Sequence, residues 1–295
     1  MIASMTAPRR SCLSVPASSD RMVTKARTLE VDEIILDLED AVVPDAKDDA
    51  RARVREAVAE EGWAARRVAV RVNGLGTPWC EDDIAALAAA GGVLESIILP
   101  KAEQAADLAS LDHLLEAADA GADRPLRVQA LIESAAGLQS VAEIAAASPR
   151  LDALILGYAD LAASLGRTRD GARELDLWAP AQHAVLTAAR AQGLHAIDGP
   201  WLGTTVDEPF LAAATRARDL GFDGKWAIHP VQTASLEELF TPDEDELVWA
   251  REVLAALDGA REEGGRGAVA LDGQMLDEAV AVAARRTLER AGENV

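Results

Sequence analysis

The stretch EIILDLEDAVVPDAKDDARARVREAVAEEGWAARRVAVRVN, residues 33–73, contains the repeating unit that decides the fold. Its ends, EIILDLE (33–39) and VAVRVN (68–73), are short and rich in β-branched residues and leucine, as is typical of strands buried on both faces of a sheet. Between them AKDDARARVREAVAEE (46–61) has helical spacing and the length of a crossover helix. This order predicts two parallel strands with the helix packed outside them.

The same alternation runs from residue 11 to about residue 240. The predicted strands are 11–16, 33–39, 68–73, 96–101, 126–133, 152–157, 195–200 and 225–230. A second clear helical stretch is ESAAGLQSVAEIAAA (133–147). Eight repeats in a chain of 295 residues predict an α/β fold closed into a (β/α)8 TIM barrel. An open doubly wound sheet is the alternative, but no G-x-G-x-x-G or Walker loop follows any strand.

The pattern divides the chain into three parts. Residues 1–9 are predicted to be a flexible tail, 10–240 the barrel, and 241–295 a C-terminal helical arm or lid. The arm is predicted to be too short for a core of its own.

Within the arm, TPDEDELVWAREVLAALDGAREEG (241–264) begins with an acidic first turn and ends at glycines, as a capped helix does. Gly264, Gly265 and Gly267 predict a flexible hinge. GQMLDEAVAVAARRTLERAG (273–292) is the last predicted helix.

The composition excludes several classes of partner. The formal net charge of −21 argues against nucleic acid and against an anionic membrane, because phosphate binding needs clustered Lys and Arg. No apolar run approaches the ~20 residues that a membrane helix requires. Cys12 and Cys80 form neither a disulfide framework nor a zinc site and predict free thiols in a reducing cytoplasm.

Charged and polar side chains collect at the C-terminal ends of the predicted strands, where barrels of this class place their active sites. They are Asp37, Glu39, Asp40, Arg71, Asn73, Lys101, Glu133, Asp160, Asp198 and His229. The opposite strand ends carry no comparable collection of charge. This one-sided clustering indicates a functional site at the mouth of the barrel.

Glu133 and Asp160 follow neighbouring strands, so their carboxylates are expected to converge on one ion. Hard oxygen ligands without His or Cys favour Mg²⁺, which needs only one or two carboxylates beside water and substrate oxygens. The alternative is that Glu133 caps the helix that it precedes.

Arg71 lies in an otherwise apolar strand, where an unpaired charge is costly to bury. Its planar fork suits the bidentate binding of a carboxylate. The alternative is a structural ion pair with Glu39 or Asp37.

Nine motifs occur in order along the chain, and together they resemble the CitE-like branch of the HpcH/HpaI aldolase and citrate lyase β-subunit superfamily. They are RRSCLSVPA, ILDLEDAV, RVNGLGTPWCEDD, ILPKAE, ALIESAAGL, GYADLAASLG, AIDGPW, GKWAIHP and GQMLD. The resemblance runs from about Arg9 to Gly292. It implies a TIM barrel that forms homo-oligomers, commonly in threes or sixes, and that cleaves or forms malyl-, citramalyl- or citryl-type thioesters with Mg²⁺.

The resemblance also implies roles for individual residues. Glu133 and Asp160 match the metal ligands, and Arg71 matches the arginine that binds the oxo acid. Glu39 and Asp40 fall where acidic residues hold metal-bound water in the substrate site. The remaining matches are Arg21 and Lys25 for contacts with the phosphates of CoA, and Asp277 for an acid/base delivered by the arm of a neighbouring subunit.

Relatives usually have a glutamate immediately before the metal aspartate, and this chain has Ala159 there. The predicted function is the Mg²⁺-dependent cleavage of a 3-hydroxyacyl-CoA, such as malyl-CoA or citramalyl-CoA, into an acyl-CoA and a 2-oxo acid, or the reverse condensation. The alternatives are a citrate lyase β-subunit that needs an acyl-carrier partner, and a weakly catalytic oligomer that binds an oxo acid or acyl-CoA. The sequence names neither the acyl group nor the choice among lyase, synthase and thioesterase.

Overall fold

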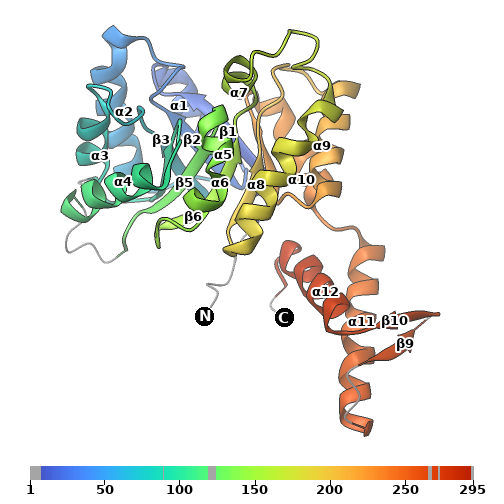
Figure 1. The fold of residues 1–295 in the computed structure, drawn as a ribbon. Coiled ribbons are helices and arrows are strands. Elements are labelled where there is room, and N and C mark those ends of the chain that lie inside the picture. Colours follow the sequence, from blue (N-terminus) through green and yellow to red (C-terminus); the bar gives the residue numbers. More distant parts are fainter. Residues whose placement is uncertain (1–7, 89, 119–123, 265–267, 272, 294–295) are drawn as a thin grey trace. The chain divides into compact units, whose positions relative to one another are not determined.

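A computed structural model describes residues 8–88, 90–118, 124–264, 268–271 and 273–293. Eight parallel strands form a closed barrel in chain order, and helices surround it (Figure 1). The strands are β1 (Ser11–Pro16), β2 (Glu33–Asp37), β3 (Arg67–Arg71), β4 (Leu94–Leu99), β5 (Arg127–Ile132), β6 (Leu151–Leu156), β7 (His195–Asp198) and β8 (Gly224–Ala227). All eight predicted strands are confirmed, and the pairing of β1 with β8 closes the barrel and rejects the open sheet.

The connecting helices follow the strands in the order expected of a TIM barrel. They are α1 (Asp20–Ala26), α2 (Lys47–Ala59), α3 (Cys80–Ala88), α4 (Ala105–Ala118), α5 (Ala135–Gln139), α6 (Val141–Ala145), α7 (Tyr158–Ser164), α8 (Ala179–Ala191), α9 (Glu208–Leu220) and α10 (Thr233–Phe240). Short 3₁₀ turns lie at Pro44–Ala46, Leu175–Trp178 and Pro230–Gln232. Among the helices that the structure describes, none combines the length and apolar character needed to cross a membrane.

The stretch 133–147, predicted as one helix, is two short helices. Ser134 caps the first by accepting a hydrogen bond from the N–H of Gly137. Ser140 then leaves the helical conformation, with φ −100° and ψ 8°, between α5 and α6. Serine favours caps over helix interiors because its hydroxyl competes for backbone groups.

The barrel interior is filled by aliphatic side chains and one indole ring. One buried residue or more from every strand joins the same cluster, which includes Ile35, Ile98, Leu131, Ile155 and Trp226. Both cysteines are buried free thiols, and Cys12 belongs to this cluster. A core packed in this way makes the barrel a rigid support for residues at the strand ends.

A buried charge network lies at the N-terminal ends of the strands, where the sequence analysis expected none. Arg9 is only 1% exposed, although the sequence placed it in the N-terminal tail. Its guanidinium donates to both carboxylate oxygens of Asp152, at 3.2 and 2.9 Å, and lies 3.7 Å from Glu33. The expectation of ordinary strand ends was wrong because the position of Arg9, before the first strand, does not reveal that its side chain turns inward.

The chain forms two compact units, Arg9–Glu237 and a second that contains Glu238–Val295. In the second unit α11 (Glu244–Gly264), the hairpin of β9 (Val269–Leu271) and β10 (Gln274–Leu276), and α12 (Glu278–Arg290) pack together. Ala250, Val253, Leu257, Leu276, Ala281, Ala284 and Leu288 form its own buried cluster. The expectation that the arm has no core was therefore wrong.

The sequence analysis also missed the hairpin, whose strands have only three residues each. Of the predicted hinge, Gly264 is the last residue of α11, and Gly265 and Gly267 lie outside the described residues.

Asp223 joins β7, α8 and the start of β8. Its two carboxylate oxygens accept hydrogen bonds from Arg190, each at 2.8 Å, and Oδ2 also accepts one from the N–H of Ala196. Burial alone would raise the pKa of Asp223, but the neighbouring His195 and Arg190 outweigh it and hold that pKa well below its usual range.

We expect Asp223→Asn to lower the free energy of unfolding by about 3 kcal/mol at neutral pH, because it leaves Arg190 buried without its partner charge. Because the pKa is depressed in the folded state, this contribution is complete above the unfolded value near pH ~4 and is lost on acidification below it. Urea unfolding at several pH values measures the difference. Asp219→Asn is the control, since its ion pair with Arg218 is well exposed and should be worth less than ~1 kcal/mol. Equal losses of unfolding free energy in the two variants would contradict the role of Asp223 as the partner charge of Arg190.

Candidate active site

The mouth of the barrel contains a cavity of about 310 Å³ at the C-terminal strand ends. Its polar wall is formed by predicted site residues from four strand ends, namely Asp37, Asp40, Arg71, Glu133 and Asp160. Its apolar wall contains Pro16, Leu131, Pro200, Trp226 and Ile228. A second hollow of about 570 Å³ adjoins it and shares Asp40.

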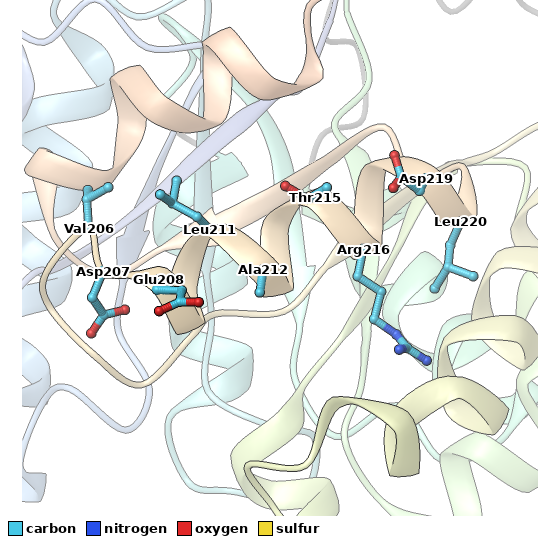
Figure 2. Close-up of a pocket in the computed structure, with 9 residues that line it drawn as sticks. All are labelled: Val206, Asp207, Glu208, Leu211, Ala212, Thr215, Arg216, Asp219 and Leu220. Carbon is cyan, nitrogen blue, oxygen red and sulfur yellow. The ribbon is translucent and has the colours of Figure 1, made fainter.

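A larger hollow, of about 900 Å³, lies elsewhere, along the outer face of α9. Figure 2 shows its side chains spaced along this one helix, from Asp207 and Glu208 at the start to Asp219 and Leu220 at the end. Its cation, Arg216, already hydrogen-bonds Asp176 and Gln182. Cavity volume alone therefore does not identify the candidate active site. The charged side chains that converge at the barrel mouth identify it instead.

Glu133 follows β5 and is buried, with 3% exposure. Its Oε1 accepts a hydrogen bond from the backbone N–H of Lys101 at 2.9 Å. Its Oε2 lies against Gly157, where an added Cβ would come within 2.8 Å of that oxygen and 2.5 Å of the Glu133 Cβ. Burial, followed by the negative charges of Glu39 and Asp160, raises the pKa of Glu133 to about 8. Ser134, and not Glu133, caps the following helix, so the capping alternative is wrong.

Asp160 lies in the first turn of α7, one strand along from Glu133, and its carboxylate is half-buried. The two carboxylates line the same cavity and repel each other, which is the reason that each would gain from a shared cation. No group of three or more His, Cys, Asp or Glu side chains suited to a metal occurs in the part of the chain that the structure describes. Two carboxylates still fit Mg²⁺, which completes its octahedron with water and substrate oxygens.

Arg71 ends β3 with its fork held by acidic neighbours. Nε and Nη2 donate to the two oxygens of Asp37 at 2.8 and 2.6 Å, and Nη1 lies 2.8 Å from Glu39 Oε2. The alternative of a structural ion pair is thus observed. A guanidinium has five N–H groups, however, so these three contacts leave two for a ligand in the cavity. The guanidinium also lies 5.6 Å above the ring of Trp226.

Glu39 and Asp40 follow β2 and meet Lys101. The ammonium group of Lys101 pairs with Glu39 Oε1 and lies 3.8 Å from Asp40 Oδ2. Glu39 is buried and Asp40 is exposed. Burial raises the pKa of Glu39, although the charges of Arg71 and Lys101 oppose this shift.

Three of the other strand-end residues make internal contacts. Asn73 donates to Asp83 at 2.6 Å, and His229 Nδ1 accepts the N–H of Val231. Asp198 accepts hydrogen bonds from Lys225 and from the hydroxyl of Tyr158, both at 2.5 Å. None of these three residues lines the 310 Å³ cavity, although Asn73 lines the adjoining hollow.

Arg21 and Lys25 are exposed on one face of α1, one helical turn apart, where α1 leaves the end of β1. Within the described residues neither forms an ion pair. Their charges are thus available to an anionic ligand at the rim of the barrel.

Asp277 belongs to the second compact unit, where it is the N-cap of α12. Its Oδ1 accepts hydrogen bonds from the N–H groups of Ala279 and Val280 at 3.0 and 3.3 Å. The carboxylate thus stabilises the helix terminus, and one of its oxygens makes both contacts.

Sequence reasoning missed three residues of the cavity. Gly157 leaves room for Glu133, Tyr158 connects the cavity wall to Asp198, and Trp226 lies beneath Arg71. The indole N–H of Trp226 has no hydrogen-bond partner among the described residues. Each lies within a strand-end motif that the sequence analysis quoted, but positions were chosen there by charged and polar side chains, which glycine and aromatic residues do not satisfy.

Comparison with known proteins places the chain in a family. Residues 10–230 match the HpcH/HpaI aldolase/citrate lyase family. The L-malyl-CoA/beta-methylmalyl-CoA lyase of Cereibacter sphaeroides is 42% identical over 288 residues, which cover 92% of this chain and 90% of that protein. A (3S)-malyl-CoA thioesterase of the same species is 38% identical over 96% of this chain and 95% of its own length.

Among solved structures, CitE of Mycobacterium tuberculosis in complex with magnesium, acetoacetate and coenzyme A is 34% identical. The two structures superpose with a TM-score of 0.75, and the match covers 98% of this chain and 100% of the CitE chain. The fold, the family match over most of the chain and the identity to curated lyases agree. The chain belongs to the HpcH/HpaI aldolase/citrate lyase family and is a lyase.

Proposed function

We propose that this lyase cleaves malyl-CoA into acetyl-CoA and glyoxylate, and forms malyl-CoA in the reverse direction, with Mg²⁺ as cofactor. The observation that carries the proposal is the buried Glu133 beside Asp160 in one cavity with the fork of Arg71. A site for the carboxylate and α-oxygen of an oxo acid needs a divalent cation and a planar cationic group side by side. The identity to L-malyl-CoA/beta-methylmalyl-CoA lyase supports the choice of substrate.

Glu133 and Asp160 would hold the Mg²⁺. Their donors are all oxygen atoms. Burial and the negative charges of Glu39 and Asp160 raise the pKa of Glu133 although the charge of Arg71 opposes the shift, so a bound cation would stabilise the ionised carboxylate. When bound, Mg²⁺ supplies a Lewis acid for the oxygens of the substrate. Magnesium is present with oxaloacetate in a citrate lyase β-subunit structure from M. tuberculosis that is 33% identical, and this supports the cofactor.

Arg71 would orient the substrate by donating its two remaining N–H groups to the carboxylate of the oxo-acid part. Glu39 and Asp40, at the end of β2, would hold water beside the metal site. In cleavage the hydroxyl carbon becomes the aldehyde carbon of glyoxylate, and the hydroxyl proton is released. The electron pair of the broken carbon–carbon bond passes to the α-carbon of the acyl-CoA, which then takes a proton.

Asp277 is proposed to supply that proton, and to remove it in condensation. We further propose that its arm serves a neighbouring subunit of a trimer or hexamer in the cytoplasm. Arg21 and Lys25 would bind the phosphates of CoA and thus provide a local basic surface on a chain with a net charge of −21.

A thioesterase is the second candidate, because a (3S)-malyl-CoA thioesterase is 38% identical to this chain. The two reactions release different products from malyl-CoA. A lyase yields glyoxylate and acetyl-CoA with no free thiol, whereas a thioesterase adds water and yields malate and free CoA. Trapping glyoxylate as its phenylhydrazone and titrating free thiol in parallel separates them.

We expect the purified protein, without an acyl-carrier partner, to release glyoxylate and little thiol. Chelation should abolish turnover, and Mg²⁺ or Mn²⁺ should restore it, because the proposed ligands are hard oxygens. Thiol release without glyoxylate would identify a thioesterase. Activity only with an acyl-carrier partner would identify a citrate lyase subunit, and a lack of turnover with intact ligand binding would leave the weakly catalytic oligomer.

Gly157→Ala tests the packing of the metal carboxylate. The added Cβ would collide with Glu133, so the carboxylate must turn away from its present orientation. We expect the affinity for Mn²⁺, measured by electron paramagnetic resonance, to fall by at least about tenfold. Gly74→Ala is the matched control at the same end of the barrel, because its new Cβ would meet nothing closer than 4.0 Å. Equal affinities in the two variants would remove Glu133 from the metal site.

Asp277→Asn tests the acid/base. Asparagine is as good an N-cap as aspartate, so folding and metal binding should persist while turnover falls by at least ~10²-fold. Mixing this variant with Glu133→Ala under subunit exchange should restore part of the activity, because each subunit would complement the other. Full activity in Asp277→Asn alone would leave the residue only its capping role, and no complementation despite proven exchange would place the arm over its own barrel.

A further inference from the structure

Lys101 has a strained backbone at the edge of the proposed active site. Among the described residues it is the one non-glycine with a positive φ, +52°. An L-residue with a Cβ is disfavoured in this left-handed region, and such conformations persist where the surrounding structure fixes them. The contacts of Lys101 show which groups this conformation positions.

The left-handed turn directs the backbone N–H of Lys101 to Glu133 Oε1, at 2.9 Å. The next residue, Ala102, donates its N–H to the carbonyl of Leu131 in β5 at 3.3 Å. Helix α5 packs tightly on the other side, since a Cβ on Gly137 would lie 2.3 Å from the carbonyl oxygen of Ala102. The turn is therefore fixed between β5 and α5 in the conformation that aims the N–H at Glu133.

The side chain of Lys101 reaches the other half of the site. Its ammonium group pairs with Oε1 of Glu39, and Oε2 of the same carboxylate lies 2.8 Å from Nη1 of Arg71. Glu39 is thus a bridge between two cations, one from β3 and one from the turn after β4. Removing either cation would free the carboxylate to rotate and would change the orientation of the other.

We propose that Lys101 is a positioning residue that couples the two halves of the active site. Its backbone N–H orients Glu133 for the metal, and its ammonium group holds Glu39 against Arg71 for the oxo acid. The inference rests on the proposed function, in which Glu133 is a metal ligand and Arg71 binds the substrate carboxylate. A lysine side chain 46% exposed would otherwise make only a surface ion pair of little consequence.

The role of the side chain is tested with Lys101→Met, which keeps the length of the stem and removes the charge. We expect KM for glyoxylate, measured in condensation with acetyl-CoA, to rise about tenfold, while KM for acetyl-CoA and the Kd for Mn²⁺ change little. Lys101→Arg should restore most of the glyoxylate affinity. Arg218→Met is the control, because Arg218 is of similar exposure and pairs with Asp219 on α9. An unchanged KM for glyoxylate in Lys101→Met would overturn this half of the proposal.

The role of the backbone is tested by comparing Lys101→Gly with Lys101→Val. Both lack the ammonium group, but glycine adopts a positive φ freely and a β-branched residue resists it most. We expect the Val variant to bind Mn²⁺ at least about tenfold more weakly than the Gly variant, because its N–H leaves Glu133. Lys101→Ala should fall between them and replaces the Val variant if circular dichroism shows that the latter is unfolded.

Equal Mn²⁺ affinity in the Gly, Ala and Val variants would overturn the backbone role. A wild-type protein that binds no Mn²⁺ and uses no glyoxylate would overturn the proposed function and this inference with it. A wild-type protein that does both, with variants that behave like it, would overturn the role of Lys101 alone.

Discussion

The burial of one carboxylate, that of Glu133, constrains the rest of the candidate active site. A carboxylate with 3% exposure needs hydrogen-bond donors and a positive partner, or it takes up a proton. The surrounding chain supplies one donor, the N–H of Lys101, and Lys101 has a left-handed backbone conformation. The chain also has glycine at position 157, where any Cβ would displace the carboxylate. A strained backbone conformation and a glycine thus define the orientation of one side chain.

Arg71 shows a further constraint, the burial of a cation at the end of an apolar strand. Asp37 accepts two of its N–H groups and Glu39 faces a third, so the guanidinium is anchored without any ligand. Buried ion pairs of this kind contribute little net stability, since desolvation offsets the attraction. What they provide here is a fixed direction for the N–H groups that remain, and such preorganisation is worth more to a binding site than the pair is worth to the fold.

Most of the fold was predictable because parallel strands buried on both faces are apolar throughout, and this signal is strong even in short runs. The polar residues at the strand ends were predictable for the same reason, since they interrupt those runs. Arg9 was not, because a charge before the first strand carries no sign of the direction in which its side chain points. The left-handed turn at Lys101 and the vacant space at Gly157 depend on distances between separate strands, which no local pattern contains. The β9–β10 hairpin was missed because three-residue strands are too short to show a period.

The capping of α12 by Asp277 and its proposed acid/base role are compatible, and the geometry indicates why. An N-cap residue lies outside the helical conformation, here at φ −139° and ψ −171°, and its side chain turns back over the first turn. Both N–H groups that it satisfies bind the same oxygen, Oδ1. Helix α12 packs against α11 and the hairpin in a unit with its own apolar cluster, so the carboxylate is carried by a packed element. Within the described residues the other oxygen, Oδ2, makes no hydrogen bond, and a side chain that caps with one oxygen can transfer a proton through the other without loosening its helix. Asp277, Glu133 and Arg71, the three residues that we propose for the reaction, are thus each anchored by a structural contact.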